Sequence, residues 1–248
     1  MRHTNESDDL LIGRNAVTEA LKSGRPIRRL LAARGSEGSI RRLTALARQR
    51  GVPVRFVSRS ELDRLTGGVH QGVAAYTAAH AYSSVEEILA RAQRAGEDPF
   101  LIVLDDLSDP RNLGAILRTA ECAGAHGVII GRRRSPGLTA TVAKTSAGAV
   151  EYVPVACVAN IARTLAELKQ RGIWTAACDM DGERYDSVDL KGPIALVIGS
   201  EGAGLGRLVR ETCDFAVSIP LCGRIESLNA SNAAAVLMYE VRRQRDGR

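Results

Sequence analysis

The sequence predicts an α/β protein with two domains, the larger of which holds a mostly parallel sheet. Helical and extended patterns alternate along the 248 residues. Continuous apolar runs, such as FLIVL (100–104) and IALVI (194–198), are typical of strands that are covered on both faces. Charge divides the chain: residues 1–78 hold 14 Lys+Arg against 7 Asp+Glu, whereas residues 79–248 hold 20 against 21. We therefore expect a small basic domain followed by a larger, nearly neutral one.

The N-terminal domain, residues 1–78, is predicted to be a small α/β module. Helices are predicted over 15–22, over 39–50 and near Glu61, and extended segments over 27–33, 52–57 and 72–78. Arginine supplies 13 of the 14 cations in this domain. Because the planar guanidinium suits bidentate phosphate contacts, the composition favours a nucleic-acid partner over a merely solvated charged face.

Residues 79–98 are predicted to be a linker and a first helix. Ser84 and Glu87 have the spacing of a capping box, and Gly96 follows the last helical residue. The second domain, residues 99–248, begins with the strand FLIVL.

Strands and helices alternate along the second domain. Pro110 is suited to a first helical turn, and the helix that it opens is predicted to end at Gly124. Later strands are predicted in GVII, YVPV, IWTAAC, IALVIG and DFAVSIP, with helices near Val142, Leu165 and Leu208 and over 229–243. Ligands of open parallel sheets bind beyond the carboxyl ends of strands. Three glycine- or asparagine-rich segments are expected there: DPRNLGAILR (109–118), GSEGAGLG (199–206) and IPLCGRIESLNAS (219–231).

The glycine-rich segment does not have the spacing of a phosphate-binding loop. Leu205 stands where a P-loop needs lysine, and Gly202, Gly204 and Gly206 recur at every second residue instead of as G-x-G-x-x-G. Glu201 would repel an anion. The segment therefore suits a ligand that approaches bare backbone, including one with positive charge, and a plain tight turn is the alternative.

Other features narrow the class of protein. The apolar runs are too short to span a bilayer, and no leader precedes them, so we expect a soluble, cytoplasmic protein without membrane contact. Five scattered cysteines suit a reducing compartment. Four histidines without metal-ligand spacing predict no metal site.

The three segments, in this order, resemble the motifs of the SpoU family of RNA ribose methyltransferases in the SPOUT superfamily. The resemblance covers residues 100–243 and is closest to enzymes that methylate the 2′-oxygen of a guanosine in 23S rRNA. The matching residues are Asn112, Gly114 and Arg118, then Gly199, Glu201, Gly202 and Gly204, then Ile219, Pro220, Gly223, Ser227, Leu228, Asn229 and Ser231. Residues 10–78 match more loosely the family's N-terminal RNA-binding module, which resembles certain ribosomal proteins.

The resemblance implies a trefoil knot, a rare exception to the rule against threaded chains. It also implies S-adenosylmethionine as the cofactor and a homodimer formed through the knotted domain, including its C-terminal helix. The implied cofactor-binding residues are Gly199, Gly204, Ile219, Pro220, Leu221 and Leu228. The implied catalytic residues are Asn112, Arg118, Glu201, Ser227 and Asn229, although Ser227 could be a plain helix cap.

Arg118 has the role of catalytic residue by this resemblance. A guanidinium stays protonated, so we expect Arg118 to hold an RNA phosphate and stabilise the developing alkoxide instead of acting as a free base. Asn112 and Asn229 are expected to orient the ribose and Arg118. Glu201 is expected to bind Arg118 or the partner strand, with simple bracing of its loop as the alternative. The predicted RNA-binding residues are Arg28, Arg29, Arg41, Arg132, Arg133 and Arg134.

The predicted function is S-adenosylmethionine-dependent 2′-O-ribose methylation of rRNA, at a guanosine of 23S rRNA. The alternatives are an antibiotic-resistance rRNA methyltransferase, a tRNA methyltransferase, and an RNA-binding protein without catalytic activity. Intact Asn112, Arg118 and Asn229 argue against the last. In this scheme residues 1–78 provide most RNA affinity, and their deletion is expected to leave cofactor binding and the dimer intact.

Overall fold

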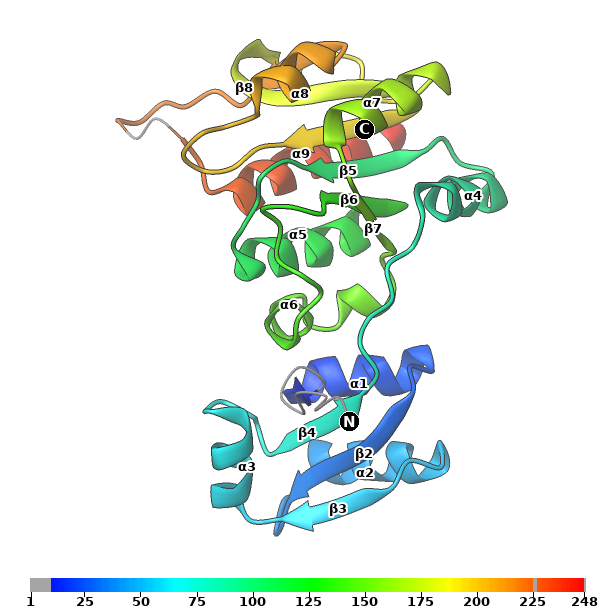
Figure 1. Ribbon diagram of the computed structural model, residues 1–248, viewed down its shortest axis with the longest axis vertical. Coiled ribbons are helices and arrows are strands. Elements are labelled where there is room, and N and C mark those ends of the chain that lie inside the picture. The colour runs from blue at the N-terminus through cyan, green and yellow to red at the C-terminus, as the bar shows by residue number, and fades with distance from the viewer. Residues whose placement is uncertain (1–9, 225–226, 248) are drawn as a thin grey trace. The chain divides into compact units, whose positions relative to one another are not determined.

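The computed structural model describes residues 10–224 and 227–247. The chain separates into two compact units (Figure 1). The N-terminal unit holds the residues up to Ala81 together with Gly137–Tyr152, and the C-terminal unit holds Tyr82–Pro136 and the residues from Val153 onward. The first nine residues of the predicted N-terminal domain lie outside the described residues.

The N-terminal unit contains a four-stranded sheet in the order β1-β4-β2-β3. Its strands are β1 (Leu10–Ile12), β2 (Ile27–Ala33), β3 (Val54–Val57) and β4 (Val73–Thr77), and its first three helices are α1 (Arg14–Ser23), α2 (Ser39–Gln49) and α3 (Arg59–Thr66). β2 and β3 are parallel, whereas β4 runs antiparallel to both β1 and β2. Leu31, Val57 and Leu62 pack in its core. β1 was not predicted, because three residues show no periodicity and only pairing with β4 makes them a strand.

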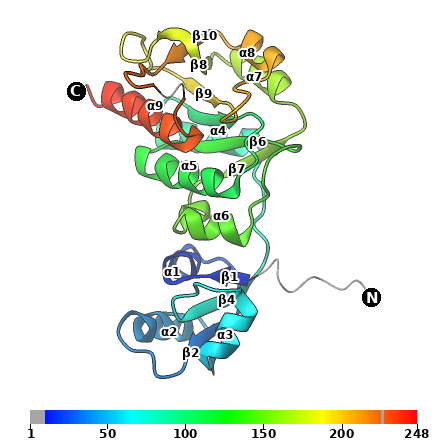
Figure 2. The ribbon, with the colours of Figure 1, turned by 90° about the vertical axis from the view of Figure 1, so that its left-hand side faces the viewer.

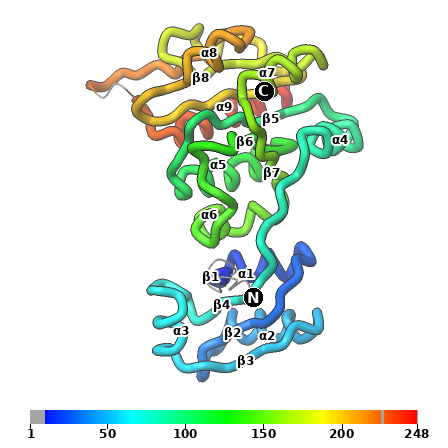
Figure 3. The backbone as a smooth tube through the Cα atoms, viewed as in Figure 1, coloured from blue at the N-terminus to red at the C-terminus, as the bar shows by residue number. Residues whose placement is uncertain are grey.

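Residues 137–152 belong to the N-terminal unit although they lie between β6 (Gly127–Gly131) and β7 (Val155–Val158) in the sequence. Figure 3 traces the path of the backbone from β6 to β7. They form α6 (Ala140–Thr145) and the short 3₁₀ helix η1 (Ala149–Glu151). Glu151 accepts a hydrogen bond from Arg25 at 2.9 Å, with only 4% and 11% of the two side chains exposed. Tyr152 donates to Glu19 at 2.6 Å. The crossover between β6 and β7, residues 137–152, is therefore a structural part of the N-terminal unit. The functional division at residues 78 and 99 stays a prediction.

The C-terminal unit contains a six-stranded sheet in the order β10-β8-β9-β5-β6-β7. All five pairings are parallel, which confirms the mixed α/β fold with a mostly parallel sheet. The strands are β5 (Phe100–Leu104), β6 (Gly127–Gly131), β7 (Val155–Val158), β8 (Trp174–Arg184), β9 (Ile194–Ile198) and β10 (Phe215–Ser218). β7 begins three residues later than the predicted YVPV strand, because Tyr152 is the C-cap of η1 and the turn after it takes up Val153 and Pro154.

Helices cover both faces of this sheet. They are α4 (Val85–Ala95), α5 (Pro110–Ala123), α7 (Ile161–Gln170), α8 (Arg207–Thr212) and α9 (Ala230–Arg245). Ile88 of α4 and Leu165 of α7 pack with Val103 of β5 in one buried cluster, whereas α5 and α9 pack together on the other side (Figure 2). The predicted capping box of Ser84 and Glu87 begins α4. Among the described residues, no helix has the length and apolar character needed to cross a membrane.

Candidate active site

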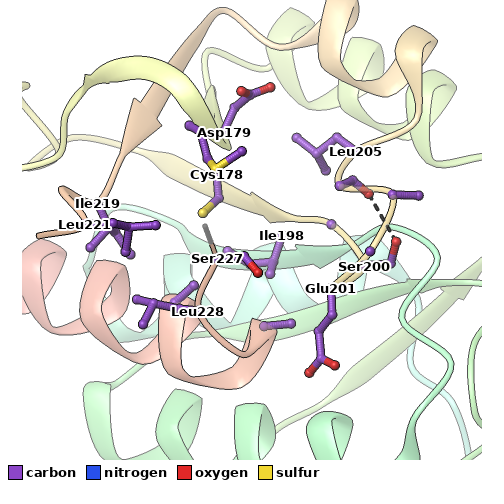
Figure 4. Close-up of a pocket in the computed structure, with 17 residues that line it drawn as sticks. Cys178, Asp179, Ile198, Ser200, Glu201, Leu205, Ile219, Leu221, Ser227 and Leu228 are labelled. Atoms are coloured by element: carbon purple, nitrogen blue, oxygen red, sulfur yellow. Dashed lines mark hydrogen bonds between the residues drawn. The ribbon is translucent and has the colours of Figure 1, made fainter. Parts of the chain in front are cut away.

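A cavity of about 440 Å³ lies where β9 ends (Figure 4). Three stretches border it: residues 178–180 of β8, residues 198–205 at and after the end of β9, and a C-terminal stretch between Ile219 and Ala233. The cavity has the volume of a typical small-molecule site. Strands β8, β9 and β10 are parallel neighbours of one sheet region, so segments far apart in sequence meet here.

The loop after β9 is closed on itself and brings bare backbone to the cavity. The N–H groups of Ser200 and Gly204 each donate to the other residue's carbonyl oxygen at 3.0 Å. A Cβ atom on Gly199 would lie 2.3 Å from the carbonyl carbon of Gly204, so the loop closes this tightly only with glycine at position 199. Gly204 has φ +64°, a value that also favours glycine.

The far end of the same loop is held by Asp105, which follows β5. The N–H of Gly206 donates to Asp105 Oδ2 at 2.8 Å. Burial raises the pKa of the Asp105 carboxyl, and the bond from Gly206 offsets part of that rise. The loop is thus shaped by contacts within the protein before any ligand binds.

The C-terminal stretch supplies apolar side chains and one hydroxyl. Ile219, Leu221, Ser227 and Leu228 line the cavity, and Leu221 and Leu228 are 38% and 37% exposed (Figure 4). Pro220 lines a neighbouring depression with Gly223 and Arg224 instead. Five of the six predicted cofactor-binding residues therefore border one cavity, and Pro220 lies beside it.

Asn112, Glu201 and Asn229 form a polar cluster at the edge of the cavity. Asn112 Nδ2 donates to Glu201 Oε1 at 2.8 Å, and Asn229 Nδ2 donates to Asn112 Oδ1 at 3.0 Å and also to Glu201 Oε1. These residues come from α5, the loop after β9 and the start of α9. Glu201 is the member that lines the cavity.

The start of α9 determines how Asn229 is oriented. Asn229 is the N-cap, and its Oδ1 accepts hydrogen bonds from Ser231 N, Ser231 Oγ and Asn232 N. Because the oxygen is used by the helix, the amide nitrogen points to Glu201 and Asn112. Ser227 is not the cap of α9 and lines the cavity instead. The crowd of small polar residues before this helix thus has two tasks, capping and bordering the cavity.

Arg118 lies apart from this cluster. It is exposed on α5, six residues after Asn112, which places it roughly 120° around the helix. It is not among the residues that line the cavity. Within residues 10–224 and 227–247, Glu201 bonds to the two asparagines and not to Arg118.

The arginines predicted to bind RNA are exposed and divided between the units. Arg28 and Arg29 lie on β2 and Arg41 on α2. Arg132, Arg133 and Arg134 follow β6, and Arg134 forms an ion pair with Asp106. Their exposure is compatible with phosphate contacts and with simple solvation.

Sequence reasoning missed the part of the cavity wall that β8 supplies. Cys178, Asp179 and Met180 line the cavity. Burial raises the pKa of the Cys178 thiol to about 11, so this group is neutral at physiological pH. Burial also opposes ionisation of Asp179, but hydrogen bonds from Asp181 N–H and from Arg210 (2.7 Å) lower its pKa overall. No local pattern marked these residues, because only the pairing of β8 with β9 brings them here.

The arrangement suits a ligand with apolar surface and positive charge. The walls are apolar side chains and glycine backbone, and among the described residues that line the cavity Asp179 and Glu201 carry carboxylates. Across the described part of the chain, no three His, Cys, Asp or Glu residues form a group that could hold a metal ion.

Comparisons with known proteins agree with this geometry. Residues 99–239 match the model of the SpoU rRNA Methylase family, and residues 10–83 match a model described as RNA 2′-O ribose methyltransferase substrate binding. The protein YacO of Bacillus subtilis (strain 168), assigned by its name to the TrmH family of tRNA/rRNA methyltransferases, is 48% identical over 97% of this chain and 98% of its own.

Two crystal structures resemble the whole chain. The SpoU methyltransferase AviRb from Streptomyces viridochromogenes, in complex with the cofactor AdoMet, has a TM-score of 0.80 and 28% identity over 96% of this chain and 91% of its own. An AdoMet-bound rRNA methyltransferase from Sinorhizobium meliloti has a TM-score of 0.78 and 26% identity, over 95% and 87% of the two chains.

Proposed function

Because the chain belongs to the SpoU rRNA methylase family of RNA methyltransferases, we propose that it methylates a ribose 2′-oxygen of 23S rRNA, at a guanosine, in the cytoplasm. The observation that carries this proposal is the cavity itself. Two of the three family-like segments line it, and the first, through Asn112, bonds to Glu201 at its edge. The match of residues 10–83 to a substrate-binding model for RNA 2′-O ribose methyltransferases supports ribose as the position.

The cavity fits S-adenosylmethionine. Leu221, Leu228 and Ile219 offer apolar surface for a base, and the glycine backbone after β9 offers hydrogen-bonding groups without side chains. Asp179 and Glu201 provide negative charge for a cationic ligand. When bound, S-adenosylmethionine supplies a methyl group on a sulfonium, and AviRb, a structural neighbour, carries this cofactor.

The protein's contribution to methyl transfer is to position and to stabilise charge. Asn112 and Asn229 hold the Glu201 carboxylate at the edge of the cavity. Arg118 binds the RNA phosphate next to the target ribose and stabilises the oxygen as its proton leaves. The proton passes to phosphate or water, because a guanidinium is a poor proton acceptor.

A homodimer completes the site in this proposal. Arg118 is exposed on α5 and does not border the cavity of its own chain. α5 packs with α9, on which Tyr239 is 52% exposed. We propose that a second copy covers this side and brings its Arg118 to the cavity. Sedimentation of the protein as a monomer at assay concentrations would contradict this part.

The trefoil knot is proposed on the same family membership. The loop of residues 199–206 and the stretch from Ile219 to Asn229 meet at the cavity and are joined by the bond from Asn229 to Glu201. A knot would hold these two segments together at the cavity. Its signature is slow refolding of the C-terminal unit that no proline isomerase accelerates.

The test of the function is methyl transfer to defined RNA. We expect saturable calorimetric binding of S-adenosylmethionine, inhibition by S-adenosylhomocysteine, and transfer of a labelled methyl group to protein-free 23S rRNA at one ribose. Mapping of ribose methylation in rRNA from a deletion strain identifies the nucleotide. Failure of the folded protein to bind the cofactor contradicts the proposal.

The name of the Bacillus subtilis relative covers both tRNA and rRNA, so tRNA is the second candidate substrate. Parallel assays with total tRNA and with 23S rRNA separate the two. Transfer to tRNA alone would replace rRNA in the proposal and leave the chemistry unchanged.

A further inference from the structure

The N-terminal unit contains a second cavity, of about 660 Å³, that lies wholly within its own residues. It is bordered by the loop after β2 (34–37), by the loop before β4 (68–72), and by residues of three helices: Arg14 of α1, Ile40 of α2, and Arg59 and Asp63 of α3. Its volume falls in the range of small-molecule sites, although its lining is mainly polar. None of the arginines predicted from the sequence to bind RNA lines it.

Three other arginines border this cavity: Arg14, Arg34 and Arg59. Arg14 is held by two bonds, from Nε to the Gln71 carbonyl oxygen at 3.1 Å and from Nη1 to Ser39 Oγ at 2.7 Å. The side chains of Arg34 and Arg59 are exposed, and no described residue forms a hydrogen bond or ion pair with either guanidinium. Two guanidinium groups are therefore free to bind phosphate oxygens.

One wall of this cavity is braced by hydrogen bonds within the protein. His70 is buried; its Nδ1 accepts from Gly72 N–H at 2.8 Å, so its Nε2 carries the proton and donates to Asp63 at 3.0 Å. Gly72 has φ +81°, and a Cβ there would lie 2.5 Å from Ile40 Cδ1. This loop is therefore tightly placed and can serve as one side of a preformed site.

Two other lining groups indicate what accompanies the phosphate. Val69 is 73% exposed, which offers an apolar surface to a base or ribose. Glu37 is exposed and has an acceptor carboxylate for amino, imino or hydroxyl hydrogens. A bare anion would gain nothing from Val69 and would be repelled by Glu37. Phosphate, a flat apolar face and hydrogen-bond donors occur together in a nucleotide.

We propose that this cavity binds one unpaired nucleotide of the RNA substrate, with its phosphate on Arg34 and Arg59 and its base or ribose against Val69 and Glu37. Unpaired nucleotides are the usual targets of specific RNA recognition, because their bases can leave the stack and enter a concave site. The proposal depends on RNA being the substrate, as the proposed function holds, but it concerns a site that takes no part in methyl transfer.

The test compares two double variants that remove the same charge. Arg34→Ala/Arg59→Ala removes the two guanidinium groups of the cavity that no described residue binds. Arg42→Ala/Arg64→Ala removes two exposed arginines, on α2 and α3, that do not line the cavity. Binding to a protein-free 23S rRNA transcript is measured across a salt series. We expect the first variant to bind at least about tenfold more weakly, with a salt slope smaller by about 0.7 for each phosphate that it no longer binds. The control should change affinity less than about twofold.

Equal decreases in affinity in both variants would show diffuse electrostatic attraction and overturn the proposal. Cofactor titration and circular dichroism check that each variant is folded. If Arg34→Ala/Arg59→Ala does not fold, crosslinking of wild-type protein to a 4-thiouridine-labelled transcript tests instead whether RNA occupies the cavity. Crosslinks within 34–40 or 68–72 support the site, and crosslinks confined to other segments exclude it. The two proposals can fail separately. If only Arg34→Ala/Arg59→Ala binds RNA more weakly but the wild type transfers no methyl group, the proposed function is contradicted and the nucleotide site is not. If the wild type transfers methyl groups and both double variants lose affinity equally, only the nucleotide site is contradicted.

Discussion

The cavity after β9 and the cavity of the N-terminal unit are lined by different types of residue. The first is lined by apolar side chains and glycine backbone, and the Glu201 carboxylate at its edge accepts hydrogen bonds from two asparagines. The second has three arginines at a braced polar wall. Of the described residues that line the first cavity, none is arginine or lysine, and of those that line the second, only Ile40 and Val69 are large apolar residues.

This contrast indicates how the protein divides its work. Salt weakens charge attraction but hardly affects backbone hydrogen bonds and apolar contacts, and few charged groups face the cofactor. Cofactor affinity should therefore depend on salt much less than RNA affinity does. Guanidinium groups gain affinity by releasing counterions from RNA, so RNA affinity should depend strongly on salt. A change in one region should therefore leave the ligand of the other region unaffected.

The largest expected effect is on chemistry alone. Arg118→Ala should lower the methylation rate by roughly 100- to 1000-fold, because a charge-stabilising donor is removed, while the calorimetric affinity for S-adenosylmethionine stays within about twofold. Arg118→Lys should recover part of the rate, since the charge remains without the planar fork. Arg163→Ala, on exposed α7 surface, is the control. Near-normal turnover of Arg118→Ala would show that the residue is not catalytic.

A smaller effect is expected on cofactor affinity. In Gly199→Ala the added Cβ would lie 2.3 Å from backbone of the same loop, so the loop must open. Affinity for S-adenosylmethionine should fall roughly 10- to 100-fold, the usual range for overpacking, with RNA affinity unchanged. Gly192→Ala is the matched control, since a Cβ there meets nothing within 4 Å. Unchanged cofactor binding in Gly199→Ala would mean that this loop does not shape the site.

The polar cluster predicts a pH-dependent defect. Asn112→Asp places a second carboxyl group against Glu201, where Asn112 Nδ2 now donates at 2.8 Å. Like charges raise the pKa of such a pair, so a proton is shared at lower pH and the hydrogen bond returns. Methylation should fall about tenfold at pH 8 and recover towards pH 6 relative to wild type. Asn160→Asp, which keeps a helix cap, controls for the added charge. A pH profile parallel to wild type would remove the cluster from the mechanism.

The smallest effect concerns stability of the N-terminal unit. Burial and the neighbouring Arg25 lower the pKa of His80 from 6.5 to about 4. The unfolded chain therefore binds the proton first, and stability should fall as pH drops from 6.5 towards 4. Glu151 lies against His80, and burial raises the pKa of its carboxyl. Glu151 therefore favours the folded state as pH falls, opposite to His80, so the effect of His80 is measured by comparing wild type with a His80 variant.

His80→Gln should weaken that destabilisation on acidification, and scanning calorimetry at pH 7 and pH 5 measures it. A difference of a few degrees, about 2–4 °C for each 1 kcal/mol, is the expected scale. Cofactor affinity at pH 7 should not change. Identical pH dependence of wild type and His80→Gln would mean that folding does not change the pKa of His80.

Deleting residues 1–78 is a poorer test than the sequence suggested. Residues 137–152 pack on that segment, and the deletion would leave Glu151 without Arg25. Removing one partner of a buried ion pair is strongly destabilising. The truncated chain is therefore expected to be less stable for reasons unrelated to RNA, which is why paired arginine variants replace it.

Local patterns in the sequence were sufficient for most helices, for the buried parallel strands and for the three glycine- or asparagine-rich segments, two of which line the cavity after β9. Periodicity, caps and glycine positions act over a few residues, so they can be recognised without knowing the fold. The glycine-rich segment that contains Gly199 and the capping box that begins α4 were both recognised in this way.

Tertiary structure alone decided which distant residues meet. Asn112 bonds to Glu201 and Asn229 across 89 and 117 residues. The order β10-β8-β9-β5-β6-β7 brings Asp179 to the cavity, and the crossover 137–152 folds with the N-terminal unit. These contacts depend on which strands become neighbours and which faces are buried together. That choice is made by packing of the whole chain, and no single segment carries its signal.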